Sequence, residues 1–180
     1  MHLKFEHMMK SYLIKQGNHY CNVSIFERIF SVGYKMKRIF FKFKFHPECW
    51  WTPARNSDDN DLNKLYGLSF GLNSDHSDSV RLAWKPDFNV SGKIDIYGYI
   101  YDKLADSQHL SQYITSVQTG EDCLANIASN GDKYEFRVNT VNAEMANTHP
   151  DPGLCFRLFP YFGGNNTAPH DMTIEIEFQS

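Results

Sequence analysis

Three tyrosines at alternating positions are the residues of this chain best suited to contact a ligand. Tyr97, Tyr99 and Tyr101 belong to the segment Lys93-Ile-Asp-Ile-Tyr-Gly-Tyr-Ile-Tyr101. If this segment is an extended strand with its isoleucines in the core, the phenol rings stand on the opposite face, about 7 Å apart. Aromatic rings on such a face stack on the apolar faces of sugar rings. The alternative is that another part of the chain covers the three rings as a second small core.

Two charged residues can add hydrogen bonds to this aromatic face. Asp95 lies on the same side of the expected strand, and Arg81 belongs to the segment Ser79-Val-Arg-Leu-Ala-Trp84. A carboxylate and a guanidinium both bind sugar hydroxyls. The alternative is a structural ion pair between Arg81 and Asp95 across two strands.

Two histidines extend the chemistry toward catalysis. His76 precedes the segment that contains Arg81, and His170 stands beside Asp171 near the end of the chain. A lyase needs a base, often Tyr or His, and a cation or amide that neutralises a uronate carboxylate. A tyrosine of the aromatic face together with His76 and Arg81 has the required residue types, but their spacing is not diagnostic. The alternative for His170 and Asp171 is that they cap a loop through bonds to its backbone.

The acidic residues do not follow a metal-binding motif. Three groups supply the oxygen ligands that calcium takes: Asp58, Asp59 and Asp61; Asp75 and Asp78; Asn165 and Asp171. The glycine that a calcium loop requires is missing from its place in each. We therefore expect no metal and no cofactor, with calcium near Asp171 as the alternative.

The cysteines and the apolar segments indicate the cellular setting. The four cysteines, at positions 21, 49, 123 and 155, lack the Cys-x-x-Cys spacing of zinc sites. No segment has the features of a signal peptide or the length of a membrane span. We therefore expect reduced thiols, synthesis in the cytoplasm without a signal peptide, and no membrane contact, with a virion as the alternative location.

Charge is distributed unevenly along the chain. Residues 1–50 hold nine Lys or Arg and three Glu, whereas residues 51–180 hold nine basic and eighteen acidic residues. Either the N-terminal part docks on an acidic surface, or basic and acidic strands are neighbours in one sheet. The net charge of −3 produces no general attraction to nucleic acid. The phenylalanines of Ile39–Phe45 alternate as core residues do, so we expect no nucleic-acid partner.

Short stretches of alternating apolar and polar residues recur about every ten residues, which is typical of β-strands. Residues 24–32 suit either a strand or a short helix, residues 102–111 a polar link, and residues 139–152 an irregular stretch. The closing strands, joined by a loop with Gly163 and Gly164, resemble a hairpin-like pair. We expect strands over 11–16, 39–45, 65–70, 79–84, 93–101, 113–117, 123–127, 134–138, 154–158 and 172–178.

This pattern predicts an all-β fold, an antiparallel two-sheet β-sandwich of jelly-roll or concanavalin-like arrangement. It forms one domain over residues 1–180, with residues 1–10 as a loose N-terminal tail.

Several motifs resemble those of a family of small, uncharacterised β-sandwich proteins encoded by Bacteroidetes and their phages. The resemblance covers nearly the whole chain, and its most specific part is the closing motif. It implies the β-sandwich fold and no particular reaction; a looser similarity connects the chain with concanavalin-like lectins, glucanases and polysaccharide lyases. The motifs are Tyr12-x-Ile14-Lys15-x-Gly17-x-His19-Tyr20, Asn63-Lys-Leu-Tyr-Gly-Leu-Ser-Phe-Gly71, His76-x-x-Ser79-Val-Arg-x-x-Trp84, Lys93-Ile-Asp-Ile-Tyr-Gly-Tyr-x-Tyr101 and Phe159-Pro-Tyr-Phe-Gly-Gly-Asn-x-x-Ala-Pro-His-Asp171.

From these observations we expect a non-enzymatic β-sandwich that binds a glycan or a protein surface through its aromatic face and rim loops. The alternatives are a structural or decoration component of a phage particle, in a homo-oligomer or a capsid or tail assembly, and a small polysaccharide lyase or hydrolase. No residue is assigned as catalytic. The expected ligand-binding residues are Tyr97, Tyr99, Tyr101, Arg81, Asp95, His76 and His170.

Overall fold

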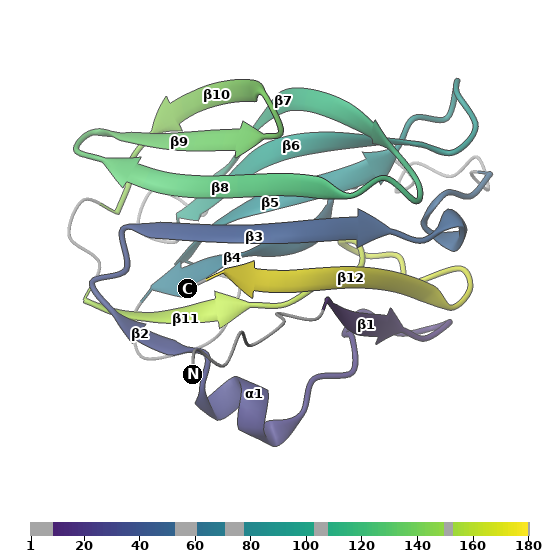
Figure 1. Cartoon of the computed structure of the whole chain (residues 1–180), viewed down its shortest axis with the longest axis horizontal. Coiled ribbons are helices and arrows are strands. Elements are labelled where there is room, and N and C mark those ends of the chain that lie inside the picture. The colour runs from purple at the N-terminus through teal and green to yellow at the C-terminus, as the bar shows by residue number, and fades with distance from the viewer. Residues whose placement is uncertain (1–8, 53–60, 71–77, 103–107, 150–152, 180) are drawn as a thin grey trace, which may run out of the picture.

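The computed structural model describes residues 9–52, 61–70, 78–102, 108–149 and 153–179 (Figure 1). They form two antiparallel β-sheets of six strands each, packed face to face. This architecture confirms the expected β-sandwich. We call the sheet that contains the first and last strands the back sheet, although it lies nearer the viewer in Figure 1, and we call the other the front sheet.

Strand order differs from chain order in both sheets. The back sheet runs through β1 (Lys10–Ile14), β12 (Met172–Gln179), β3 (Arg38–Phe45), β8 (Cys123–Asn130), β9 (Lys133–Val138) and β10 (Val141–Ala146). The front sheet runs through β2 (Val32–Tyr34), β11 (Leu154–Leu158), β4 (Asn63–Phe70), β5 (Asp78–Pro86), β6 (Lys93–Asp102) and β7 (Gln108–Gln118). The short helix α1 (Ile25–Ile29) and the 3-10 helix η1 (Pro47–Cys49) lie outside the sheets.

The core lies between the two sheets, and β3 shows how the sequence builds it. Phe41, Phe43 and Phe45 alternate with lysines and are fully buried. The ring of Phe45 lies 5.0 Å from that of Trp84 in the front sheet, and the ring of Phe41 lies 5.0 Å from that of Tyr66. Aromatic contacts across the interface therefore hold the two layers together.

The lysines of β3 explain part of the uneven charge distribution. Lys42 pairs with Glu177 of the neighbouring strand β12 at 3.4 Å, and Lys44 pairs with Asp122 at 2.6 Å. Basic and acidic segments are thus neighbours within the back sheet, as one of the two explanations predicted.

Strand β6 is extended, with its isoleucines in the core. Ile94, Ile96 and Ile100 are fully buried. Gly98 faces the same way, since a Cβ atom there would lie 3.0 Å from the Phe136 ring and from the Met145 sulfur of the back sheet. The intervening residues therefore point away from the back sheet, which places Tyr97, Tyr99 and Tyr101 on the outer face of the front sheet.

Two expectations about the later part of the chain are wrong. The closing strands are not a hairpin, because β11 pairs with β2 and β4 in the front sheet while β12 pairs with β1 and β3 in the back sheet. The stretch expected to be irregular contains β10. As an edge strand, β10 leaves most of its side chains in solvent, so its sequence lacks the alternation of a half-buried strand.

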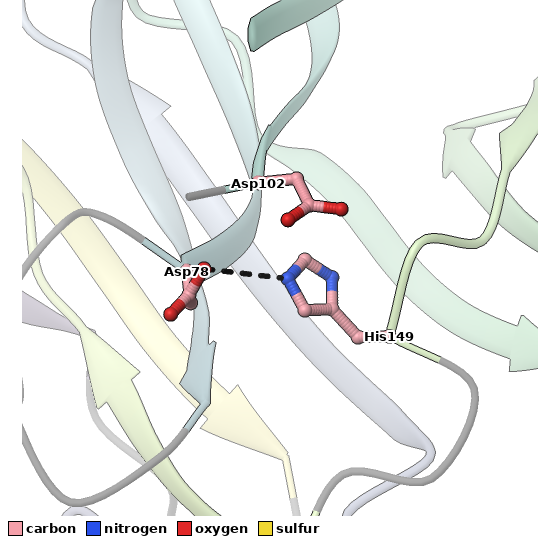
Figure 2. A group of neighbouring side chains, drawn as sticks. All are labelled: Asp78, Asp102 and His149. Atoms are coloured by element: carbon pink, nitrogen blue, oxygen red, sulfur yellow. Dashed lines mark ion pairs between the residues drawn. The ribbon is translucent and has the colours of Figure 1, made fainter. Parts of the chain in front are cut away.

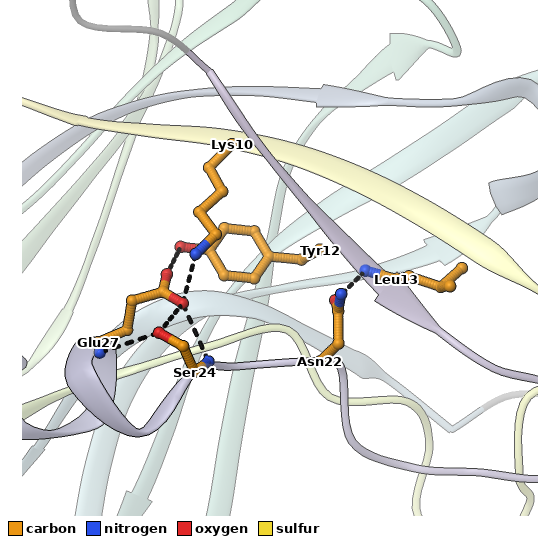
Figure 3. Close-up of polar contacts among 6 residues, drawn as sticks. All are labelled: Lys10, Tyr12, Leu13, Asn22, Ser24 and Glu27. Atoms are coloured by element: carbon orange, nitrogen blue, oxygen red, sulfur yellow. Dashed lines mark hydrogen bonds and ion pairs between the residues drawn. The ribbon is translucent and has the colours of Figure 1, made fainter.

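For residues 24–32 the sequence allowed either a strand or a short helix, and the structure forms the helix α1 there. The hydroxyl of Ser24 accepts a hydrogen bond from the Glu27 amide at 3.2 Å, and the Glu27 carboxylate accepts one from the Ser24 amide at 3.0 Å. Glu27 also contacts Lys10 and accepts a hydrogen bond from the Tyr12 hydroxyl at 3.0 Å (Figure 3). The capping box formed by Ser24 and Glu27 begins α1, and the contacts of Glu27 with Lys10 and Tyr12 connect α1 to β1.

All four cysteines are buried and none forms a disulfide. No helix within the described ranges is long and apolar enough to cross a membrane.

Candidate functional site

Arg81 lies at the centre of the outer face of the front sheet. Its neighbours in β5, Val80 and Leu82, point into the core. In register, Arg81 stands opposite Tyr99 of β6 on one side and Gly67 of β4 on the other.

The Arg81 side chain crosses over Gly67 to reach the loop that follows β11. A Cβ atom on Gly67 would lie 2.8 Å from Cγ of Arg81 and 2.2 Å from the carbonyl oxygen of Val80, so only glycine leaves this path open. The Nη2 group of Arg81 donates a hydrogen bond to the carbonyl of Phe159 at 2.8 Å. Burial lowers the pKa of Arg81 to about 10, so the guanidinium stays charged at neutral pH beneath the surface.

Tyr99 and His109 form a hydrogen-bonded pair beside Arg81. The Tyr99 hydroxyl meets Nδ1 of His109 from β7, and the Tyr101 ring centroid lies 4.1 Å from that of the imidazole. Tyr99 is 5% exposed, whereas His109 is on an edge strand and exposed to solvent. Burial raises the pKa of Tyr99 to about 12, while burial and the charge of Lys64 lower the pKa of His109. At neutral pH the pair is therefore a phenol and a neutral imidazole.

Lys64 of β4 adds a second cation to the face. Its Nζ atom lies 5.0 Å from the centroid of the Tyr99 ring and donates hydrogen bonds to the carbonyls of Leu62 at 2.8 Å and Gly163 at 3.4 Å. Burial, followed by the nearby charge of Arg81, lowers the pKa of Lys64 to about 8. Lys64 is therefore charged at neutral pH and loses its proton in mildly basic solution.

The backbone of Lys64 brings Tyr161 to the same site. The Lys64 amide donates to the Tyr161 carbonyl at 2.8 Å, and the Tyr161 amide donates to the Lys64 carbonyl at 3.0 Å. The Tyr161 ring stacks on His19, with centroids 5.4 Å apart, and meets the Tyr20 ring edge-on at 5.1 Å. Burial raises the pKa of Tyr161, whereas the charge of Arg81 lowers it by a smaller amount. Two tyrosines, one histidine and two cations thus surround one region of the sheet.

Sequence reasoning missed three of these residues. Tyr161 belongs to the closing motif Phe159–Asp171, so a signal for it was present. His109 falls in the stretch expected to be a polar link, and Lys64 immediately precedes an expected strand. Lys64 also belongs to the motif Asn63–Gly71, but the spacing around Lys64 and His109 does not relate them to each other, because only the pairing of β4, β5, β6 and β7 brings them together.

The expected row of three exposed phenols is divided in the structure. Tyr97 and Tyr101 are partly exposed, whereas Tyr99 is buried between them. The Tyr97 ring packs edge-on against Tyr113 of β7 at 5.7 Å and lies 5.8 Å from Nζ of Lys85. The middle tyrosine is therefore a covered hydrogen-bonding residue, and the outer two remain accessible.

Asp95 is not the partner of Arg81. It stands opposite Lys85 of β5 and Ser116 of β7, and its carboxylate accepts a hydrogen bond from the Ser116 hydroxyl at 2.6 Å. The predicted ion pair between Arg81 and Asp95 is therefore wrong, because the strand register places Tyr99, not Asp95, opposite Arg81.

The closing histidine and aspartate bond to the backbone of η1 and of the segment after β1, and not to the closing loop that they were expected to cap. His170 Nε2 donates to the Glu48 carbonyl at 2.6 Å in η1, and Asp171 accepts a hydrogen bond from the Gln16 amide at 2.8 Å. Calcium near Asp171 stays a prediction. His76 lies outside the described residues.

The described ranges bring three metal-ligating side chains together at one place. Asp78, Asp102 and His149 meet where β5 begins and β6 ends (Figure 2).

The fold is shared with solved structures of enzymes that act on polysaccharides. The alginate lyase AlyC3 matches with a TM-score of 0.61 at 7% identity, over 99% of this chain and 76% of that one. A family 16 glycoside hydrolase from Bacteroides ovatus, solved with a bound product, matches with a TM-score of 0.57 at 8% identity, over 98% and 82%. An alginate lyase from Alteromonas sp. 272 matches with a TM-score of 0.53 at 11% identity, over 98% and 89%. No family model and no curated protein matches the chain.

These structures correct the expectation of a non-enzymatic binding protein. The matching structures include polysaccharide lyases and glucanases, so this sandwich is one on which enzymes are built. The more specific resemblance to a family of Bacteroidetes and their phages is not shown by these comparisons, and neither is a place in a virion. At identities of 7–11% the likeness shows the fold alone.

Proposed function

We propose that the protein is a polysaccharide lyase, which cleaves a uronate-containing polysaccharide by β-elimination on the outer face of its front sheet. One observation carries the proposal: the exposed imidazole of His109 is held by the phenol of Tyr99, the charge of Lys64 acts on it, and Arg81 stands opposite Tyr99 in the neighbouring strand. The fold supports the same reaction class, since two of the similar structures are alginate lyases.

The reaction requires a base, a proton donor and a fixed positive charge. A base removes the proton from C5 of a uronate, the C4–O bond to the next sugar breaks, and a C4–C5 double bond forms. The leaving oxygen takes up a proton, so no water is consumed. Negative charge develops on the carboxylate during proton removal and is stabilised by a nearby cation.

The residues of the site divide these roles among them. His109 is the base, because its imidazole is neutral at neutral pH and Nε2 accepts a proton when Nδ1 carries the hydrogen shared with Tyr99. Lys64 provides the charge opposite the carboxylate, and Tyr161 is the proton donor. Arg81 is a positioning residue, since it is fully buried and maintains a positive potential beneath Tyr99 and Tyr161.

Hydrolysis fits the same face less well. Glycosidases use two carboxyl groups about 5–9.5 Å apart. Asp95 lies four residues from Tyr99 along β6, roughly 13 Å at the rise of a strand, and is bonded to Ser116. A second carboxylate described on this face is Asp61, whose charge acts on Lys64. Asp61 is therefore near Lys64 and Tyr99, whereas Asp95 lies further along β6, so the two carboxyl groups do not form a glycosidase pair.

The test is to incubate the full chain with alginate, pectate and glycosaminoglycans and to follow the ultraviolet absorbance of the unsaturated product. We expect the absorbance to rise with at least one polymer. His109→Gln should then lower the turnover by about 10²–10⁴-fold. The matched control is His46→Gln. His46 is a partly exposed histidine beside Glu175, and it lies between β3 and η1, outside the proposed site.

The outcomes separate the reaction classes. New reducing ends without ultraviolet absorbance would indicate hydrolysis and overturn the proposal. Absence of product from every polymer, with the β-sheet circular dichroism of a folded chain, would overturn it as well. Equal losses in the His109 and His46 variants would remove His109 as the base.

A further inference from the structure

Three side chains with metal-ligating atoms converge at the end of the sandwich, on different segments of the chain. Asp78 is the first residue of β5 and Asp102 the last residue of β6, and the two stand directly opposite each other in the strand pair. His149 comes from the segment that follows β10. One donor atom from each residue lies within 4.8 Å of the others, and both carboxyl groups lie beside the imidazole (Figure 2).

The surroundings of this group are largely closed to solvent. Asp102 is 8% exposed, and the side chain of His149 is 11% exposed. The imidazole packs on the ring of Phe70 at 4.6 Å and on the ring of Tyr134 at 6.3 Å. Asp78 retains 30% of its side-chain exposure, so the group can be reached from solvent on one side.

Two neighbouring residues, Asn147 and Thr148, fix the orientation of His149. Its Nδ1 atom lies 3.1 Å from the Thr148 hydroxyl, and its backbone amide donates to the Asn147 side chain at 2.8 Å. Its Nε2 atom is buried, finds no hydrogen-bond partner within the described part of the chain, and lies 4.0 Å from a carboxylate oxygen of Asp78. In a metal-binding histidine one ring nitrogen binds the ion while a hydrogen bond holds the other, and here Nδ1 is the nitrogen that is held and Nε2 the one left to bind.

Strand pairing places the two carboxyl groups next to each other. Asp78 and Asp102 stand directly opposite each other, and like charges at such positions destabilise an antiparallel pair unless other groups offset them. A cation bound between the two carboxylates would reduce this repulsion.

We propose that Asp78, Asp102 and His149 bind a divalent transition-metal ion of the zinc class, through one oxygen of each carboxylate and Nε2 of the imidazole. A nitrogen donor with two carboxylates suits zinc, whereas calcium takes six to eight oxygens. Metal–ligand distances of about 2.0–2.2 Å place tetrahedral donors roughly 3.3–3.6 Å apart, so the ion draws the three groups together by about an ångström. Water completes the coordination.

The ion would join the two sheets at one end. Asp78 and Asp102 belong to the front sheet, while His149 follows β10 of the back sheet. The same strands β5 and β6 carry Arg81 and Tyr99, so the site would also hold the ends of the strands that form the tyrosine face. This inference does not depend on the proposed lyase activity.

The first test is a calorimetric titration of the metal-stripped full chain with zinc and, separately, with calcium. We expect one zinc ion per chain, with a dissociation constant of about 1 μM or below, and no saturable calcium binding. At a hundredfold excess of zinc over the dissociation constant, the Tm should rise by roughly 5–10 °C. Absence of saturable zinc binding to the wild-type chain overturns the proposal.

The second test locates the ion. Asp78→Asn and His149→Gln should each weaken zinc binding by on the order of 100-fold. His46→Gln is the matched control, because His46 also lies beside two carboxylates, Glu48 at 3.8 Å and Glu175 at 3.3 Å, but is more exposed. Zinc affinity that falls only in the His46 variant, or in none of the three, overturns the assignment.

A spectrum of the wild-type chain decides the matter if a variant does not fold. Cobalt(II) bound by two carboxylates and an imidazole absorbs in the visible range without a thiolate charge-transfer band. A strong thiolate band would assign the metal to the cysteines and overturn the proposal.

Discussion

The phenol of Tyr99 orients the imidazole of His109 diagonally across two strands. Tyr99 stands opposite Ser111 in the pairing of β6 with β7, and His109 stands opposite Tyr101, so the hydrogen bond joins residues that are not direct cross-strand neighbours. The tyrosine is buried and the histidine exposed. A rigid residue within the sheet therefore holds a reactive group at its edge.

Tyr99→Phe tests this relationship. The substitution removes the hydroxyl and keeps the ring, so we expect the fold to remain while kcat on the cleaved polymer falls by about 10- to 100-fold through misplacement of His109. KM should change less than kcat. The measurement is steady-state kinetics across pH. The rise of the rate in the acidic range, which depends on the protonation of His109, should also move along the pH axis.

The control is Tyr113→Phe, which removes a phenol hydroxyl from the same sheet face where it meets Ser116 at 2.8 Å. Its kinetics should match those of the wild type. A loss in Tyr113→Phe as large as that in Tyr99→Phe would contradict the orienting role.

The pKa shifts predict a bell-shaped pH profile for the lyase reaction. His109 acts as a base above its pKa, which burial lowers, so the rate rises through the acidic range. Lys64 must be protonated, and its pKa of about 8 predicts that the rate falls above that pH. In Lys64→Arg the alkaline limb should move to higher pH, because a guanidinium keeps its charge. An alkaline limb unchanged in this variant would exclude Lys64 as its source.

Gly67→Ala should destabilise the protein. The added methyl group meets the Val80 carbonyl and the Arg81 side chain at distances that no ordinary Cβ contact shows. We expect the free energy of unfolding in urea to fall by about 1–3 kcal/mol, as for overpacking elsewhere. Gly153→Ala is the control, because no atom lies within 4 Å of its added Cβ. It should change the free energy of unfolding by less than ~0.5 kcal/mol.

Glu27→Gln should weaken the protein at neutral pH but not in acid. Burial alone would raise the pKa of Glu27, but hydrogen bonds from Lys10, Ser24 and Tyr12 outweigh it and hold the pKa below its ordinary value. A carboxylate with a lowered pKa adds stability above its unfolded-state pKa, and this stability is lost as pH falls through the folded-state pKa. We expect a difference of about 0.5–1 kcal/mol at neutral pH that closes on acidification, measured by urea unfolding.

The control for this effect is Glu144→Gln. Glu144 pairs with Lys133 at 2.6 Å, but both side chains are 54% exposed, so the pair should contribute little. A Glu27 difference that does not change with pH would contradict the role of the charged carboxylate.

The strands of the core could be read from alternation, whereas the edge strands β2 and β10 could not. In β3 and β6 one side of the strand is apolar at every second residue, because that side packs against the opposite sheet. In β10 and in β2 most side chains face solvent, so no such pattern arises. The closing pair β11 and β12 has clear strand sequences, yet strand sequences do not say which sheet each strand joins.

For the candidate site, too, one part could be predicted from the sequence and another could not. The outward direction of Tyr97, Tyr99 and Tyr101 follows from the isoleucines between them, and it was predictable. The partners of Tyr99 were not, since His109 depends on the register of β7 and Lys64 on that of β4. The burial of Tyr99 likewise results from neighbours on other strands.

By itself, the sequence determined an antiparallel two-layer β fold and the face on which its tyrosines stand, because period-two burial is a local property of each strand. Only the tertiary structure decided that Lys64, Arg81, Tyr99, His109 and Tyr161 share one region, and that Asp78 and Asp102 meet His149. These groups are joined by strand pairing and by contacts between distant segments, and such contacts depend on how the whole chain packs rather than on any short pattern of residues.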